Sequence, residues 1–310
     1  MGTVRIGLWQ GIQGILSEWH GNSSVLTDLE RTILFSIRLP RALFAGIVGA
    51  SLSLAGVVFQ ALLRNPLADP YILGISGGSA VGAMAGIIIG AGALTLGTAG
   101  FAFLGALVTI FLVLGIAGRG RVIQSTTLLL SGVIINAFFS ALIMILIAIS
   151  SNADLHNVMF WLMGDLSVAS RPEMLAAAFF LLLGFVVIYG YGRALNLITT
   201  GEETAMQLGV NVESAKRRLL VTASLVTAAA VSMSGIIGFV GLMIPHMMRM
   251  TVGPDHRLLL PAATLFGASF LALADTIART AMAPTELPVG VITALCGAPY
   301  FIFLLRRRVF

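Results

Sequence analysis

Long stretches without a charged residue make up most of the chain. One extends from Ala42 to Leu63, and another from Pro70 to Gly118, which is too long for a single bilayer crossing. The glycines around Gly90–Gly100 supply a turn, so the second stretch predicts two spans, near 71–90 and 97–117. The apolar runs are continuous rather than alternating, which predicts helical spans and argues against a membrane β-barrel.

The remaining spans follow from the same pattern and from the positive-inside rule. Apolar runs predict spans at 128–149, 174–192, 258–278 and 288–305. The basic ends Lys216–Arg218 and Arg306–Arg308 both belong in the cytoplasm, so an even number of crossings separates them. The uncharged segment 219–248 must therefore supply two crossings, the second of them short and ending at Arg249. This gives about nine spans.

Composition agrees with this pattern. Hydrophobic residues make up 58% of the chain, charged residues 10%, and the mean hydropathy is +1.00, so we predict an all-α integral membrane protein. The net charge of +5 comes from basic residues at span ends, which indicates membrane topology rather than nucleic-acid binding. A single cysteine, Cys296, excludes an intrachain disulfide and a cysteine-rich metal site.

The predicted topology divides the 18 basic residues unevenly between the two sides. We expect residues 1–37 to be an outer or interfacial segment, with an amphipathic surface helix over Val4–Trp19 as one option, and 38–310 to be the membrane domain. The inner side then holds Arg64, Arg119, Arg121, Arg193, Lys216, Arg217, Arg218, Arg249, Arg257 and Arg306–Arg308, and the outer side holds Arg5, Arg31, Arg38, Arg41, Arg171 and Arg279.

Thr199–Arg218 is the one long polar stretch inside the membrane domain. Thr200 and Glu203 have the spacing of a capping box, and Gly209 suits a turn that needs a positive φ. Asn211 can cap a second helix. We predict a short helix, a tight turn and a further helix over 199–218 that contact another protein; a long solvated loop is the alternative.

Two stripes of small residues stand out within the spans. Glycine recurs every four residues from Gly74 to Gly90, which predicts a groove for a close-packed helix. Gly132, Asn136 and Ser140 form a small, polar stripe on the span at 128–149, which either lines a water-filled path or packs against a neighbour. Between two spans, Asn152–Asp165 is amphipathic and predicts an interfacial helix.

Four long motifs carry a resemblance to a known family. They cover Arg38–Gly78 (RLPRALFAGIVGASLSLAGVVFQALLRNPLADPYILGISGG), Gly201–Val210 (GEETAMQLGV), Ser234–Arg249 (SGIIGFVGLMIPHMMR) and Glu286–Arg308 (ELPVGVITALCGAPYFIFLLRRR). With them the chain, from about residue 20 to its end, resembles the FecCD-type permease subunits of ABC importers for iron–siderophore complexes, haem and vitamin B12.

The resemblance implies a fold and a set of partners. Subunits of this family have ten transmembrane helices and pair as a homodimer or with a paralogue. Two ATPase subunits bind the cytoplasmic face, and a soluble substrate-binding protein delivers substrate outside. Family members also carry a hydrophobic helix ahead of the segment matching Val4–Glu30, so we expect either a misplaced start or a nine-span chain.

The resemblance also implies roles for particular residues. The ATPase-coupling surface comprises Glu202, Glu203, Met206, Leu208 and Gly209. The translocation path includes Gly132, Asn136 and Ser140, with a cytoplasmic gate in a loop at Ser125, Thr126 and Thr127. Docking of the binding protein involves Arg38, Arg41 and Arg279; contact with lipid phosphates is the alternative for these arginines.

We therefore expect a permease of the bacterial inner membrane that works by alternating access, with iron(III)–siderophore as first substrate, then haem, then cobalamin. We expect no cofactor of its own and no catalysis, because the chain lacks a G-x-x-x-x-G-K-[ST] loop and ATP hydrolysis then falls to a partner.

A secondary transporter is the alternative, but the mid-span carboxylates that are usual in such proteins are missing. A membrane-embedded hydrolase is disfavoured because no histidine shares a helix face with a carboxylate. His246 is interpreted as a core histidine rather than a haem ligand. The candidate carboxylates lie near span ends: Asp69, Asp165, Asp275 and Glu286.

Overall fold

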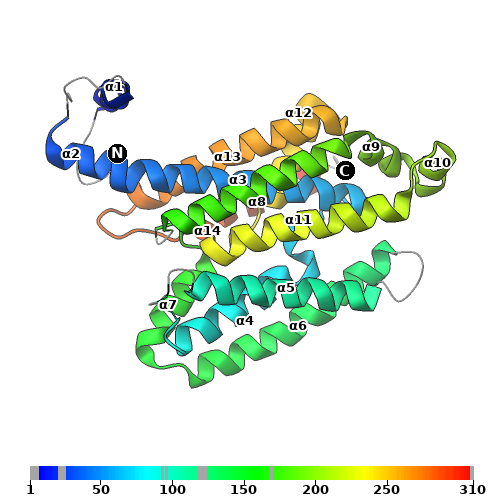
Figure 1. Cartoon of the computed structure of the whole chain (residues 1–310), viewed down its shortest axis with the longest axis horizontal. Coiled ribbons are helices and arrows are strands. Elements are labelled where there is room, and N and C mark those ends of the chain that lie inside the picture. The colour runs from blue at the N-terminus through cyan, green and yellow to red at the C-terminus, as the bar shows by residue number, and fades with distance from the viewer. Residues whose placement is uncertain are drawn as a thin grey trace.

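The computed structural model describes residues 7–19, 26–91, 94, 97–117, 124–167 and 170–307, and this part of the chain is helical, without strands. Long helices run side by side along the longest axis, with α2 and α7 at one end and α9 and α10 at the other (Figure 1). The elements are α1 (Leu8–Trp19), α2 (Asp28–Thr32), η1 (Ile33–Arg38), α3 (Leu39–Leu62), η2 (Pro70–Leu73), α4 (Ile75–Ile88), α5 (Gly97–Ala117), α6 (Ser125–Ile149), α7 (Asn152–Met163), α8 (Arg171–Gly190), α9 (Gly192–Thr200), α10 (Glu202–Gln207), α11 (Val212–Ser234), α12 (Val240–Val252), α13 (His256–Thr280) and α14 (Val289–Arg307).

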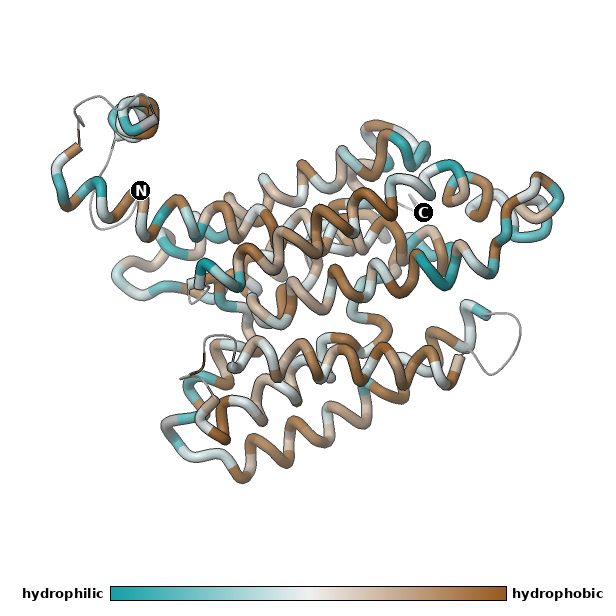
Figure 2. Tube along the Cα trace, viewed as in Figure 1, coloured by the Kyte–Doolittle hydropathy of each residue, from teal (hydrophilic) through white to brown (hydrophobic). Residues whose placement is uncertain are grey.

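A helix stands at each of the nine expected spans. Five helical segments of the described chain are long and apolar enough to cross a membrane, and α4 and α14 are shorter apolar helices. The two spans expected in 219–248 coincide with α11, which begins with charged residues, and with α12. The 13 residues of α12 extend only about 20 Å, less than a bilayer core of about 30 Å. Hydrophilic residues gather at the two ends of the bundle, as membrane spans require (Figure 2).

Helix α3 forms the core of the bundle. Its residues from Phe44 onward are nearly all buried, and it packs against α8, α11, α12 and α13. Small residues allow this contact, because a Cβ on Gly49 would collide with the backbone of α13 and one on Gly56 with the backbone of α12. Such close approach is the main source of helix association in lipid, where the hydrophobic effect gives little drive.

The glycine groove is confirmed over its middle part. A Cβ on Gly78 or Gly82 would collide with the backbone of α5, so α4 and α5 are in close contact there. The groove does not extend to its expected ends. Gly74 has φ +79° at the junction of η2 and α4, and Gly90, with φ +73°, has no atom within 4 Å of a Cβ built on it.

The N-terminal segment differs from the expected boundary. One continuous helix runs from Asp28 to Leu62, so the boundary expected between residues 37 and 38 falls inside it. A capping box between Thr27 and Glu30 fixes where this helix begins. Helix α1 lies within the range Val4–Trp19 given for the optional surface helix, and Val4 lies outside the described residues.

Helices α11 and α12 are joined by a short irregular segment at the end of the bundle that holds α7. Both Gly235 and Phe239 have φ +69°. The hydroxyl of Tyr71 donates to the carbonyl of Ile237 (3.1 Å) and accepts from its amide (3.2 Å). A side chain thus satisfies backbone groups that the helices leave unpaired. The expected interfacial helix is present as α7.

Candidate functional site

The polar stretch forms α9, α10 and the start of α11. Gly209 has φ +84°, and the side chain of Asn211 caps α11 by accepting from the Ser214 amide, both as expected. The expected capping box is wrong. Gly201 stands at the cap position of α10, and the Thr200 hydroxyl instead donates to the Leu197 carbonyl at the end of α9. Helix α9 was not expected, because its polar positions resemble a loop.

Helix α10 presents an apolar pair to solvent. Met206 is 55% exposed and Leu208 60% exposed, and Glu203 beside them is also exposed. Ala205, on the opposite side of the helix, is fully buried in a small cluster with Ile198, Val212 and Ala215. The cluster fixes α10 against α9 and α11, so Met206 and Leu208 are exposed on a rigid support, which is typical of a docking surface.

Glu202 points the other way, toward the bundle. Its Oε1 accepts from Lys216 Nζ at 3.0 Å and from Arg64 Nη2 at 2.9 Å. Burial opposes ionisation of Glu202, but the two hydrogen bonds outweigh it and lower the pKa of this carboxyl below its ordinary range. Glu202 therefore ties α10 to α11 and to Arg64, just beyond the end of α3, and it is less exposed than the other expected coupling residues.

The structure brings the expected gate and the expected coupling residues together. A hollow of about 650 Å³ is lined by residues from both sets, including Ser125 and Thr126 on one side and Glu202, Glu203 and Met206 on the other. The segment expected to form the gate is not a loop, however: Ser125, Thr126 and Thr127 form the first turn of α6. The Ser125 hydroxyl donates to the Leu62 carbonyl at 3.2 Å, which joins α6 to the end of α3.

The small, polar stripe on α6 packs at one end and is open at the other. A Cβ on Gly132 would collide with the backbone of η2, and Asn136 lies half-buried beside Gly77 of α4. Ser140 is exposed, but its hydroxyl donates to the Asn136 carbonyl. Within this chain Gly132 serves packing, while Asn136 is partly exposed and Ser140 is exposed.

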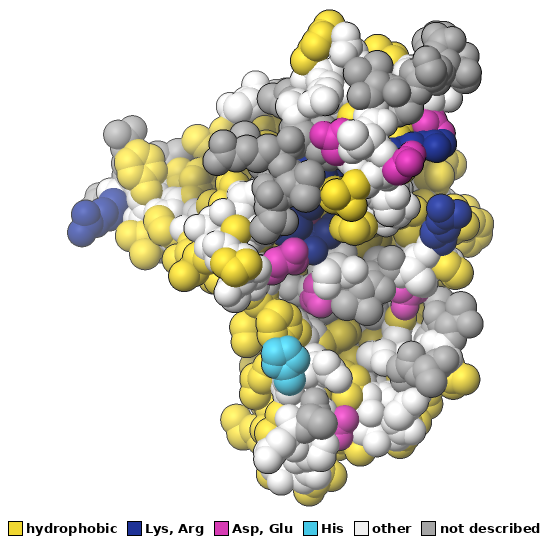
Figure 3. All heavy atoms as spheres, turned by 90° about the vertical axis from the view of Figure 1, so that its left-hand side faces the viewer, with side chains coloured by type: hydrophobic (Ala, Val, Ile, Leu, Met, Phe, Trp, Pro, Cys, Tyr) yellow, Lys and Arg dark blue, Asp and Glu magenta, His cyan; other side chains and the backbone are white. Residues whose placement is uncertain are grey.

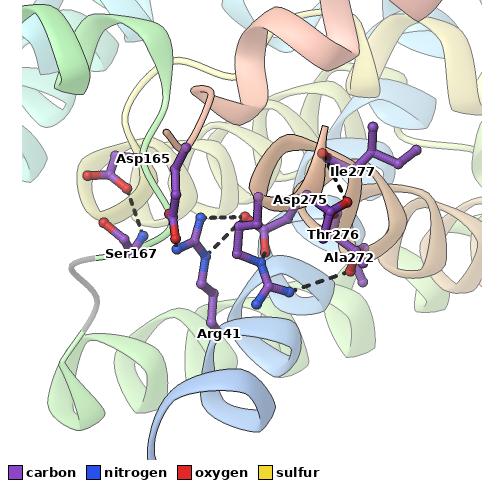
Figure 4. Close-up of polar contacts among 10 residues, drawn as sticks. Arg41, Asp165, Ser167, Ala272, Asp275, Thr276 and Ile277 are labelled. Carbon is purple, nitrogen blue, oxygen red and sulfur yellow. Dashed lines mark hydrogen bonds and ion pairs between the residues drawn. The ribbon is translucent and has the colours of Figure 1, made fainter. Parts of the chain in front are cut away.

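At the other end of the bundle, the expected docking arginines belong to an ion cluster. Arg41 Nη2 lies 3.0 Å from Asp275 Oδ1, and its Nη1 lies 2.7 Å from Glu286 Oε2. Arg279 Nε lies 3.0 Å from Asp275 Oδ2, and the Asp275 side chain is fully buried. Figure 4 shows Arg41 of α3 reaching the carboxylate of Asp275 on α13, and Figure 3 shows acidic and basic side chains close together on this face.

This cluster changes the expected role of the arginines. The side chains of Arg41 and Arg279 are only 12% and 16% exposed, so they are not free rim charges. Arg38 is partly exposed one turn before Arg41. The pairing of Arg41 with Asp275 was missed, although both residues were predicted to lie at span ends on one side of the membrane. That shared location was the available signal.

Two further polar groups are held in the interior. Arg249, the expected polar tail of α12, donates to Gln60 Oε1 of α3 at 3.0 Å. His246 lies against the rings of Tyr300 and Phe301, as expected of a core histidine. No group of metal-binding side chains occurs among the described residues. Four basic residues used in the topology lie outside the described residues, namely Arg5, Arg119, Arg121 and Arg308.

Comparison with known proteins agrees with this architecture. The cobalamin import system permease protein BtuC of Halobacterium salinarum is 46% identical, over 91% of this chain and 75% of the relative. The hemin transport system permease protein HmuU of Yersinia pestis is 44% identical, over 89% of this chain and 84% of the relative. A solved structure described as an inward-facing metal-chelate type ABC transporter is 34% identical, covers 97% of each chain and superposes with a TM-score of 0.85. The family model described as the FecCD transport family matches residues 1–307, and the chain belongs to that family.

Proposed function

We propose that this chain is the permease of a cobalamin or haem importer and forms its translocation path. As a FecCD member it is the permease subunit of an ABC importer for metal chelates, and the family is a transport family rather than an enzyme family. The two relatives named above carry cobalamin and haem in their names, which favours these cargoes over the iron–siderophore expected first.

The proposal includes three kinds of protein partner. Two ATPase subunits hydrolyse ATP and dock on α10, a second permease subunit completes the path, and a soluble binding protein docks at the end that holds Arg38. The observation that carries the ATPase assignment is the exposed pair Met206 and Leu208, held rigidly by the buried Ala205 and by the Glu202 ion pairs. The proposed location of the complex is the inner membrane of a bacterium.

Substrate identity can be tested by binding. The binding protein of the same system is titrated with cyanocobalamin, hemin and a ferric hydroxamate siderophore, and the intrinsic fluorescence is recorded. We expect saturable binding of cobalamin or haem, and stimulation of the ATPase of the reconstituted complex by that loaded protein. Saturable binding of the siderophore alone would overturn the cargo assignment and leave the permease assignment in place.

A further inference from the structure

Three exposed arginines meet where α8 ends. Arg218 Nη1 donates to the hydroxyl of Tyr191 at 2.8 Å, and the Cγ of Arg257 lies 3.5 Å from a Cβ built on Gly192. Arg193 follows Gly192 directly and is exposed, as are Arg218 and Arg257. Residues from α9, α11 and α13, distant in sequence, therefore form one basic surface, the α8 corner (Arg193, Arg218 and Arg257).

The α8 corner has more basic than acidic groups. Within the part of the chain that the structure describes, none of its three guanidinium groups forms an ion pair. The nearest acidic residue in sequence, Asp255, accepts hydrogen bonds from the Asn196 side chain and from the backbone amide of Arg257. The Asp255 carboxylate also interacts electrostatically with Arg257. The corner thus carries three positive charges against one negative charge, and this excess favours an external anion.

Two apolar helix faces lead to this corner. On α8, Leu182, Val186 and Tyr189 are 66%, 69% and 47% exposed, and on α13, Leu258 and Leu265 are 59% and 70% exposed. Figure 2 shows hydrophobic residues along α8 up to this end. Exposed leucine and valine on predicted spans contact lipid chains, so the arginines stand where the spans leave the hydrocarbon. Tyrosine is typical of that level.

We propose that the α8 corner binds the headgroup phosphate of an anionic phospholipid in the cytoplasmic leaflet. The guanidinium groups supply paired donors for phosphate oxygens, and Tyr189 packs beside the glycerol region. Lipid chains then cover the apolar faces of α8 and α13. The charge of the patch selects phosphatidylglycerol or cardiolipin over zwitterionic lipids.

The test is native mass spectrometry of the full chain in detergent, titrated with phosphatidylglycerol or phosphatidylcholine. The double variant Arg193→Gln, Arg257→Gln leaves the Arg218–Tyr191 hydrogen bond in place. The matched control is Arg31→Gln, Arg171→Gln, which removes the same charge from exposed arginines at the other end. Inorganic phosphate and the isolated ATPase subunit are added in separate arms.

We expect the unmodified chain to retain phosphatidylglycerol in preference to phosphatidylcholine. The corner variant should bind it at least about tenfold more weakly, while the control changes by less than about twofold. Absence of preference in the unmodified chain overturns the proposal without any variant. Equal loss in both double variants also overturns it, as does binding of inorganic phosphate in place of lipid. Loss of ATPase binding by the corner variant without any lipid effect assigns the corner to the ATPase instead.

Discussion

Lys216 of α11 and Glu202 of α10 form an ion pair of 3.0 Å, and the Lys216 side chain is only 2% exposed. The pair fixes a short helix of six residues that could not be stable alone. Because α11 continues through the bundle, we expect a displacement of α10 to be transmitted to this long helix. The proposed docking of the ATPase on α10 requires such a link.

Replacement of Glu202 alone should therefore destabilise the chain more than replacement of both Glu202 and Lys216. Glu202→Leu leaves Lys216 buried without this carboxylate and should lower the free energy of unfolding by about 2 kcal/mol. The expected loss is smaller than for a fully buried ion pair because Glu202 is partly exposed. The double variant Glu202→Leu, Lys216→Met should recover most of that loss. Thermal unfolding in detergent measures both, and equal stability of the single and double variants would contradict the assigned role of the pair.

Acid should loosen the same helix. The pKa of Glu202 is lowered on folding, so its contribution is complete above its ordinary value of 4.5 and is lost as the pH falls below it. The protection factors of the amides of residues 202–208, measured by hydrogen exchange relative to the intrinsic rate at each pH, should fall below that pH in the unmodified chain. In Glu202→Gln this pH dependence of the protection factors should be absent, and its persistence would assign the titration to another group.

Much of the fold could be predicted because its signals are local. The uncharged run from Ala42 to Leu63 predicts a span by its own composition, and α3 is found there. The positive φ of Gly209 and the cap at Asn211 also depend on adjacent residues, and both are confirmed. The local spacing of Thr200 and Glu203 gave a wrong prediction, because the Thr200 hydroxyl donates to a carbonyl at the end of α9 instead of forming the expected capping box.

The sites were harder to predict because they depend on contacts between distant residues. Arg41 and Asp275 are 234 positions apart, so only the packing of α3 against α13 shows that they are paired. The inward direction of Glu202 likewise depends on Ala205 being buried between α9 and α11. A pattern along one helix shows which residues share a face, but not which partner covers that face.

The contact between α4 and α5 offers a test within one helix. Gly105→Ala places a methyl group against the backbone of Gly78 and should destabilise the chain by about 1–3 kcal/mol. Gly115→Ala, on the same helix, meets no atom within 4 Å and should be neutral or stabilising by up to about 1 kcal/mol. Thermal unfolding of the two variants separates packing from helix propensity; indistinguishable unfolding temperatures would argue against close packing.

The ion cluster of Arg41, Asp275, Arg279 and Glu286 should stabilise the fold. Arg41→Ala removes two contacts from buried Asp275 and one from Glu286, with an expected loss of about 3 kcal/mol. Arg31→Ala removes an exposed arginine paired with Glu18 and should leave the unfolding temperature almost unchanged. Similar unfolding temperatures for these variants would show that Arg41 is available to a partner rather than committed to the cluster.

The central claim is that ATP hydrolysis by a partner subunit drives import of the chelate. In this account α10 couples the ATPase to the membrane helices. The decisive measurement is uptake of cobalamin or haem into proteoliposomes that contain the chain, its ATPase and its loaded binding protein. We predict uptake that requires internal ATP and is unaffected by a protonophore. Gly209→Val should abolish it, because valine resists φ +84°, while Gly209→Asn retains part of the activity. Uptake that persists without ATP and collapses with the proton gradient, or normal ATP-driven uptake by Gly209→Val, would contradict this mechanism.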